Sequence, residues 1–272
     1  MAKEKERIDV LLVQQGLFTS REQAKRAVMA GEVLDEKEQR LDKPGMKIPS
    51  ETKLHLKGNV MPYVSRGGLK LAKALDSFQI SVSDQIVLDI GSSTGGFTDV
   101  MLQNGARLSY ALDVGTNQLV WKLRNDPRVI VMENTNFRYS KPTDFTAGQP
   151  AFASIDVSFI SLRLILNPLK PILQPDGEVV ALIKPQFEAG REHVGKHGIV
   201  RDPAVHRAVI ENVFQYAVAA GFSVLNLDFS PITGGEGNIE FLVHLQANER
   251  PTINPEISIP AVQDQAYKTL RK

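Results

Sequence analysis

Four ionisable residues stand at the ends of apolar segments, where folding could bring them together. Asp156 lies near the end of AFASIDV, Lys184 near the end of EVVALIKP and Glu240 near the start of GNIEFLVHL. Lys70 precedes them in YVSRGGLKLAKAL. Each alone is the kind of charged residue that most often lies exposed, but two amines and two carboxylates together could activate an alcohol. A hydroxyl is a poor nucleophile until its proton is withdrawn, and a lysine can withdraw it if burial and a nearby cation lower its pKa.

The four residues have distinct predicted roles in that chemistry. Lys184 is predicted to be the base, and Lys70 is predicted to be the neighbouring cation. Asp156 and Glu240 are predicted to hold the ammonium groups and the hydroxyl in line. The catalytic task is then mainly one of positioning.

A second chemical feature is the turn in VLDIGSSTGGFTDVML, residues 87–102. Its glycines are Gly91, Gly95 and Gly96. Glycine lets the backbone approach a ligand closely. The spacing lacks the second glycine of the dinucleotide-binding motif and the lysine of the triphosphate-binding loop, so it favours a nucleoside without a phosphate chain. Asp113, about twenty residues beyond the turn, could accept both hydroxyl groups of a ribose.

The chain between these residues alternates apolar strand-like segments with helix-like ones. Strands are predicted at residues 86–90, 109–114, 128–132, 151–157, 178–185, 222–229 and 239–245. Continuous apolar strands separated by helices predict a parallel sheet covered on both faces, a doubly wound α/β domain. The last two strands follow one another without a helix, which predicts an antiparallel hairpin at one edge. Ligands of such sheets bind beyond the carboxyl ends of the strands.

The first sixty residues differ in being rich in charges of both signs, which predicts a small, mainly helical module. Ser20 and Gln23 form a capping box, and Gly31 is predicted to end the helix that they begin. The net charge of the whole chain is only +1, so any binding of nucleic acid must depend on a local basic patch.

This charged segment resembles a known RNA-binding family. ERIDVLLVQQGLFTSREQAKRAVMAGEVL is similar to the S4 domain over almost the whole length of the segment. The resemblance implies RNA-phosphate contacts by Arg7, Arg21, Lys25 and Arg26, which would supply affinity without reading sequence. Arg66 follows in a stretch without an acid until Asp76 and is a further candidate.

The remainder resembles the FtsJ-like RNA methyltransferases. The turn D-x-G-x-x-x-G-G is similar to their motif I, although GSSTGG lacks the proline of that motif, and the order Lys, Asp, Lys, Glu is that of their catalytic tetrad. YVSRGGLKL, IDVSFISL, ALIKPQFE and GNIEF behind an S4-like segment resemble the hemolysin A (TlyA) family of ribosomal RNA methyltransferases. The fold implied is a Rossmann-like class I methyltransferase sheet of seven strands, the last antiparallel.

This resemblance implies S-adenosylmethionine as the cofactor and 2′-O-methylation of cytidine in ribosomal RNA of the large subunit, and in some members also of the small one. The cofactor-binding residues that it implies are Asp89, Gly91, Ser92, Ser93, Gly95, Gly96, Phe97, Asp113, Val114 and Asn136. Asn136 is the implied contact of the adenine.

Four parts of the chain are expected. These are an S4-like domain over residues 1–59, a linker over 60–64, the methyltransferase domain over 65–250 and a tail over 251–272 that docks on the body or reaches for RNA. The expected partner is ribosomal RNA or a ribosomal subunit, with no membrane and no obligate protein partner. The expected location is the cytoplasm.

Other chemistries remain as alternatives. DVSF, residues 156–159, has the ends but not the prolines of the turn used by base amino-methyltransferases. Methylation at pyrimidine C5 needs a cysteine, and the chain has none. His193 and His197 are four residues apart, but Gly195 between them disfavours a helical metal site, so no metal is expected.

Non-enzymatic alternatives are an RNA-binding scaffold with an inactive transferase domain, or a membrane-lytic protein. The second follows from the hemolysin name of the family. No apolar stretch approaches the length of a membrane-spanning helix.

Overall fold

The computed structural model describes residues 5–37, 39–57 and 61–270. Contacts within the chain divide it into two units, residues 1–62 and 63–272. The predicted linker, residues 60–64, spans this division, and its first residue lies outside the described ranges.

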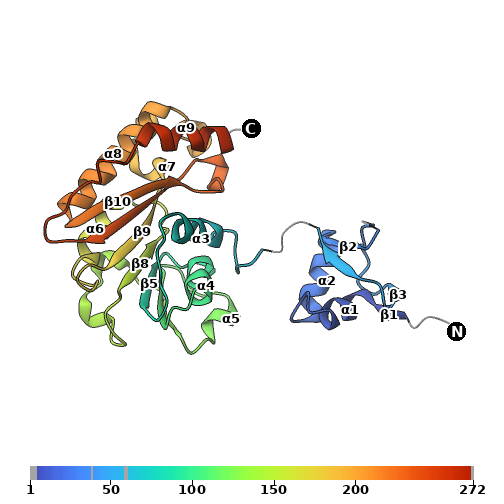
Figure 1. The fold of residues 1–272 in the computed structure, drawn as a ribbon. Helices are drawn as coiled ribbons and strands as arrows, with labels where there is room; N and C mark the ends of the chain where they lie inside the picture. The colour runs from blue at the N-terminus through green and yellow to red at the C-terminus, as the bar shows by residue number, and fades with distance from the viewer. Residues whose placement is uncertain (1–4, 38, 58–60, 271–272) are drawn as a thin grey trace. The chain divides into compact units, whose positions relative to one another are not determined.

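The smaller unit packs two helices against short strands (Figure 1). Its elements are β1 (Lys5–Arg7), α1 (Ile8–Gln14), α2 (Arg21–Ala30), β2 (Val33–Asp35), β3 (Lys47–Pro49) and β4 (Leu54–Leu56). Strand β1 pairs with β3 and β2 with β4, both antiparallel, so the two predicted helices are joined by short strands that the expectation of a mainly helical module did not include. The pattern missed these strands because each is only three residues long.

Helix α2 begins and ends where the sequence indicates, but its capping box is half formed. Ser20 Oγ accepts a hydrogen bond from Gln23 N at 3.4 Å, and Gly31 ends the helix in the left-handed region with φ 72°. The side-chain oxygen of Gln23 instead accepts from Thr19 Oγ1 at 2.9 Å. One cap bond is therefore enough to start this helix.

The larger unit is built on a seven-stranded sheet of order β10-β11-β9-β8-β5-β6-β7. Its strands are β5 (Ile86–Ile90), β6 (Leu108–Leu112), β7 (Val129–Met132), β8 (Phe152–Ile155), β9 (Glu178–Ile183), β10 (Phe222–Phe229) and β11 (Phe241–Ala247). Strand β11 runs in the opposite direction to the other six strands of this sheet. The predicted doubly wound class with an antiparallel last strand is confirmed. The last strand lies inside the sheet, between β9 and β10, and β10 forms the edge.

Helices cover both faces of the sheet (Figure 1). They are α3 (Gly68–Ser77), α4 (Gly96–Gln103), α5 (Trp121–Arg124), α6 (Arg163–Leu169), α7 (Pro185–Glu188), α8 (Pro203–Ala219) and α9 (Ile259–Leu270). Helices α3 and α4 bury Leu71 and Phe97 in the core on one face, which contains Val87. Helices α6, α8 and α9 pack in the core on the other face, which contains Leu88. Successive residues of β5 thus point into opposite cores, as in a sheet buried on both sides.

The loops at the carboxyl ends of the strands contain short 3-10 turns. These are η1 (Phe137–Tyr139), η2 (Pro142–Asp144), η3 (Arg191–His193), η4 (Lys196–Gly198) and η5 (Gly235–Gly237).

The C-terminal tail docks on the larger unit as far as residue 270. Thr252 O accepts a hydrogen bond from Val224 N at 2.8 Å, and Asn254 N donates to Val224 O at 2.9 Å. Helix α9 then packs against α8 and β10. Of the two expected arrangements, the structure shows docking.

Candidate active site

Four elements bring the predicted catalytic residues to one edge of the sheet. Lys70 lies in the first turn of α3, Asp156 directly follows β8, and Lys184 directly follows β9. Glu240 directly precedes β11. Since β8 and β9 are parallel and β11 is antiparallel, the carboxyl ends of the first two lie beside the amino end of the third. The strand order therefore places Asp156, Lys184 and Glu240 side by side, and the first turn of α3 adds Lys70.

The four side chains form a row of alternating charge. Lys70 Nζ lies 2.6 Å from Glu240 Oε2 and 3.7 Å from Asp156 Oδ2. Lys184 Nζ lies 2.5 Å from Asp156 Oδ1, an ion pair without good hydrogen-bond alignment. Lys70, Lys184 and Glu240 are only 7%, 8% and 2% exposed. Charges buried to this extent must be paired, and two ammonium groups beside two carboxylates meet that need.

The contacts of Asp156 bear on how the two lysines interact. The sequence predicts that Lys70 is a neighbouring cation of Lys184 and that Asp156 helps to hold the ammonium groups, and in the structure both lysines contact the carboxylate of Asp156. A carboxylate between two ammonium groups offsets their repulsion. Asp156 is therefore the residue that joins the two lysines.

Several polar and aromatic neighbours of the tetrad are not predicted by the sequence. Lys184 Nζ donates to Ser158 Oγ at 3.2 Å, and Gln186 Nε2 donates to Glu240 Oε1 at 3.4 Å. Phe159 is 90% exposed, has a left-handed backbone with φ 63°, and lies with its ring centre 5.0 Å from that of Phe187. A bulky residue is rarely found in that backbone region. Proximity to Asp156 and Lys184 in the sequence is the signal that could have found these neighbours.

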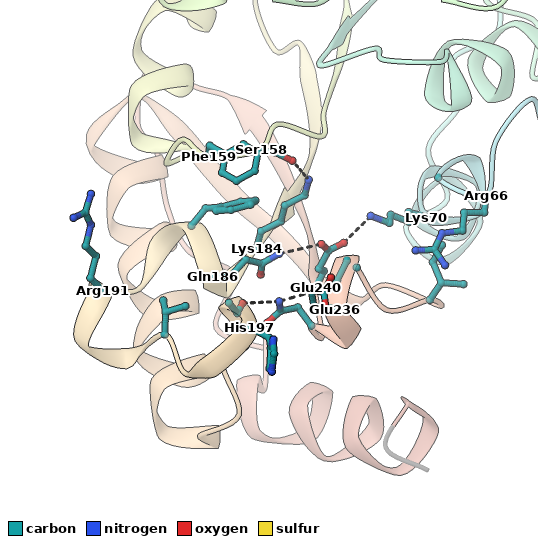
Figure 2. A pocket seen from close by; sticks show the side chains of 18 residues that line it. Arg66, Lys70, Ser158, Phe159, Lys184, Gln186, Arg191, His197, Glu236 and Glu240 are labelled. Carbon is teal, nitrogen blue, oxygen red and sulfur yellow. Dashed lines mark hydrogen bonds and ion pairs between the residues drawn. The ribbon is translucent and has the colours of Figure 1, made fainter. Parts of the chain in front are cut away.

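Three residues of the tetrad line the larger of two adjoining clefts, which Figure 2 shows. This substrate cleft has a volume of about 750 Å³, and Lys70, Lys184 and Glu240 form part of its wall. Arg66 and Arg191 stand on opposite sides of it in Figure 2. The predicted RNA-binding residue Arg66 is therefore beside the tetrad.

The second cleft, the cofactor cleft, has a volume of about 390 Å³. The predicted cofactor residues that line it are Gly91, Ser93, Asp113, Val114 and Asn136. Asp156 lines it too, and Ser158 and Phe159 line both clefts. Segment 156–159 is therefore where the two clefts meet. Gln118 also lines the cofactor cleft and is not predicted by the sequence.

Backbone amides fix Asp113 in the cofactor cleft. Its Oδ2 accepts from Ser93 N at 2.8 Å, and its Oδ1 accepts from Gly115 N at 2.7 Å. Each oxygen keeps a lone pair for another donor. Asn136 Oδ1 accepts from Arg138 N at 3.2 Å and caps η1. Both side chains are thus held at the cleft by bonds within the chain.

The other predicted cofactor residues lie outside that lining: Asp89, Ser92, Gly95, Gly96 and Phe97. Phe97 belongs to the core beneath α4, and Ser92 is buried, with its amide donating to Leu112 O at 3.0 Å. Gly95 is left-handed with φ 98°, and a Cβ there would meet Leu123 at 2.3 Å. A Cβ on Gly96 would lie 3.0 Å from the backbone of Gly68 in α3. These motif residues shape the turn and lie behind the lining of the cleft.

Asp89 supports the same turn from within the core. Its Oδ2 accepts from Thr98 N at 2.9 Å and Thr98 Oγ1 at 2.7 Å, and its Oδ1 accepts from Ser154 Oγ at 3.1 Å. Complete burial raises the pKa of Asp89 to about 7, although the hydrogen bonds from Thr98 and Ser154 act in the opposite direction. The carboxyl group therefore links β5, α4 and β8 and does not reach the cleft.

The predicted RNA-binding residues of the smaller unit have different surroundings. Arg7 Nε and Arg21 Nη2 each lie 2.9 Å from the buried Asp9 carboxylate. The hydrogen bond from Arg7, with the one from Arg21, lowers the pKa of Asp9 to about 2. Lys25 lies 3.4 Å from Glu22, and Arg26 is exposed. Arg7 and Arg21 therefore have a structural task in addition to any contact with RNA.

Three features of the described ranges bear on the alternatives. They contain no cluster of metal-binding side chains, and His193 instead lies 3.8 Å from Glu192. No helix within 5–37, 39–57 or 61–270 is long and apolar enough to cross a membrane. In DVSF, the acid Asp156 contacts two lysines.

The strand order and the paired clefts place residues 63–272 in the class of Rossmann-like methyltransferase domains. The chain belongs to the FtsJ-like methyltransferase family, whose model matches residues 63–247. The predicted family is thereby confirmed.

Similar proteins extend over both units. A Bacillus subtilis protein named provisionally as the rRNA methyltransferase YqxC is 59% identical, with 100% of this chain and 98% of that protein covered. The 16S/23S rRNA (cytidine-2′-O)-methyltransferase TlyA of Mycobacterium tuberculosis is 37% identical, with 97% of each covered. A solved structure from Streptococcus thermophilus, described provisionally as a hemolysin, is 62% identical with a TM-score of 0.77, and 98% of each chain is covered.

Proposed function

We propose that this protein transfers a methyl group from S-adenosylmethionine to the ribose 2′-hydroxyl of a cytidine in ribosomal RNA. The observation that carries the proposal is the buried row Lys184, Asp156, Lys70 and Glu240 at the junction of two clefts. The family and the name of the 37% identical relative support the reaction and the substrate. Such a substrate would place the reaction in the cytoplasm.

The residues of the cofactor cleft fit S-adenosylmethionine. Its volume of about 390 Å³ lies in the range of small-molecule sites. Gly91 has φ 86°, and a Cβ there would lie 2.5 Å from Asp156 O, so only glycine leaves the turn open at this point. Asp113 offers one remaining lone pair on each oxygen to the ribose hydroxyls. When bound, the cofactor supplies a methyl group on a sulfonium, which is a good leaving group.

The tetrad supplies the proton transfer in this proposal. Lys184 first loses its proton to solvent through the open cleft and then accepts the hydroxyl proton at Nζ. The Lys184–Asp156 ion pair of the structure corresponds to the state after that transfer. Ser158 orients Nζ by accepting from it, and Lys70 with Glu240 holds Asp156 in place.

The RNA would be held by groups on both units. Arg66 and Arg191 at the two sides of the substrate cleft suit phosphates that flank the target nucleotide. Phe159 offers an exposed ring at the mouth of the site for a base. We assign residues 1–59 as an S4-like RNA-binding module that adds affinity, with ribosomal RNA or a ribosomal subunit as the partner.

The test is direct identification of the product. The purified chain is incubated with methyl-labelled S-adenosylmethionine and ribosomal RNA or subunits, and the RNA is digested to nucleosides for mass spectrometry. The proposal expects 2′-O-methylcytidine. A methyl group on the base would support the amino-methyltransferase alternative, and no incorporation into any of these substrates would refute the proposed function.

A further inference from the structure

Lys73 lies one turn beyond Lys70 on α3 and joins that helix to the end of β10. Its Nζ donates to Asp228 Oδ1 at 2.8 Å and to Phe229 O at 2.7 Å. The same ammonium group lies 3.5 Å from the centre of the Phe229 ring. The Lys73 and Asp228 side chains are 23% and 18% exposed, so solvent only partly screens this contact. A carboxylate, a carbonyl and an aromatic face together hold one ammonium group.

The anchor point of Lys73 is directly beside Glu240. Phe229 pairs with Phe241 in the ladder of β10 and β11, and Ser230 N donates to Glu240 O at 2.9 Å. Lys70 holds the side chain of Glu240 at 2.6 Å. Two lysines of one helix therefore hold adjoining positions of one hairpin.

Other contacts also restrain the connection between the two strands: Asn238 Oδ1 accepts from Val200 N at 3.1 Å, and its Nδ2 donates to Gly198 O at 2.9 Å. Strand β10 is an edge strand whose ladder partner in the sheet is β11, and the tail bonds to it at Val224, toward the end of the strand away from Phe229. The connection between the two strands contains Gly234, Gly235 and Gly237, and the first two line the substrate cleft. Glycine adds backbone freedom. A contact that fixes α3 to Phe229 therefore limits how far Glu240 can move from Lys70.

We propose that Lys73 is a positioning residue that keeps Glu240 against Lys70 and so maintains the geometry of the tetrad. The inference rests on the proposed function, since it gives Lys73 a part in the same reaction. Misplacing reacting groups by about 1 Å can lower a rate by about a hundredfold. Removing the Lys73 ammonium group should therefore lower the rate of methyl transfer and leave ligand binding intact.

Lys170 provides a matched control at the opposite end of the same strand. Its Nζ donates to Asn248 O at 3.2 Å and lies 5.6 Å from the ring of Phe222, the first residue of β10. Lys73→Met and Lys170→Met thus each remove a lysine that joins a helix to a carbonyl and an aromatic ring. Only the first lies near the tetrad.

The experiment compares kcat, the KM for each substrate, and hydrogen exchange of residues 230–240. Lys73→Met should lower kcat by about tenfold or more and change each KM by less than about threefold, whereas Lys170→Met should change kcat by less than about threefold. Lys73→Arg should recover most of the rate because arginine keeps the charge and the donors. Exchange in 230–240 should be faster in Lys73→Met only.

Two results would overturn the inference. One is a kcat in Lys73→Met that stays near the wild-type value or falls no further than in Lys170→Met. The other is unchanged exchange in residues 230–240 of Lys73→Met, even where the rate falls. A wild-type chain that methylates no ribose would instead refute the proposed function, and the exchange comparison would still decide whether Lys73 restrains Glu240.

Discussion

Lys184 and Lys70 carry the same charge but have different surroundings. Lys70 Nζ contacts the carboxylates of both Glu240 and Asp156. Lys184 Nζ contacts one carboxylate and the hydroxyl of Ser158. Lys70 is thus tied to both carboxylates of the tetrad, which suits a residue that holds them in place. Lys184 is tied to one carboxylate and one hydroxyl, and we assign it as the base on this geometry.

Lys184→Arg tests that assignment because arginine keeps the charge but cannot lose its proton. We expect kcat to fall by about 10²- to 10⁴-fold, the usual contribution of a general base. The affinity for S-adenosylmethionine, measured by calorimetry, should stay the same because Lys184 does not line the cofactor cleft. Lys170→Arg, far from the site, is the control. Near-normal transfer by Lys184→Arg would show that another group takes the proton.

Asp113→Asn tests the proposed ribose contact. Asparagine replaces one acceptor oxygen by a donor, so either Ser93 N or Gly115 N loses its partner, and one ribose hydroxyl loses its acceptor. Hydrogen bonds to charged groups contribute about 1.5–3 kcal/mol, so the Kd for S-adenosylmethionine should rise about tenfold or more. The measurement is isothermal calorimetry, with the affinity for RNA as the control. An unchanged Kd would remove Asp113 from the cofactor site.

At the level of secondary structure, Asp89 links strand β5 to helix α4 and strand β8. Thr98 belongs to α4 and Ser154 to β8, and both donate to this one carboxyl group at the end of β5. The turn from Gly91 onward starts directly after these bonds. Asp89 thus influences the cofactor cleft through the position of α4.

Its raised pKa predicts how the larger unit responds to pH. The folded chain holds the proton of Asp89 more tightly than the unfolded chain does. The free energy of unfolding therefore falls as the pH rises from about 4 to about 7, and above pH 7 this contribution is constant. Asp89→Asn should lack this part of the dependence, since an amide can donate to Ser154 and accept from Thr98. Urea titrations at several pH values measure the free energy of unfolding of both proteins. Between about pH 4 and about pH 7 that of the wild type should fall by a few kcal/mol relative to that of Asp89→Asn. A difference between the two proteins that stays constant over this range would contradict the prediction.

The strands were predictable because buried parallel strands form continuous apolar runs, as in IVLDI and EVVALI. The helices were less so. Helix α5 is only Trp121–Arg124, and the residues before it form a loop in which Gln118 N donates to Glu133 Oε1. Gln118 could not be assigned to the site because its position depends on a loop fixed by tertiary contacts. Asp156, Lys184 and Glu240 could be proposed because they lie at strand ends, where topology alone brings residues together, whereas Lys70 lies in α3.

For the whole molecule, the small net charge means that RNA affinity must come from particular side chains. In the smaller unit, Arg7 and Arg21 are engaged with Asp9, and Lys25 lies near Glu22. Within the described ranges of that unit, Arg26 has no ion pair and is exposed. Lys25 and Arg26 are therefore the residues of this predicted set that can turn to a phosphate at the lowest cost to the fold.

The double variant Lys25→Gln with Arg26→Gln should weaken RNA binding and its salt dependence without unfolding the smaller unit. The slope of log K against log salt concentration is negative. For every phosphate that the variant no longer neutralises, the magnitude of this slope should decrease by about 0.7 to 0.9. Arg21→Gln is the informative comparison, because it removes one partner of the buried Asp9 and should lower the stability of the unit as well. Filter binding at several salt concentrations and thermal unfolding of both variants separate the two effects. If the double variant keeps the wild-type slope while it remains folded, the RNA-binding surface of this unit lies elsewhere, because a protein that neutralises fewer phosphates must release fewer counterions.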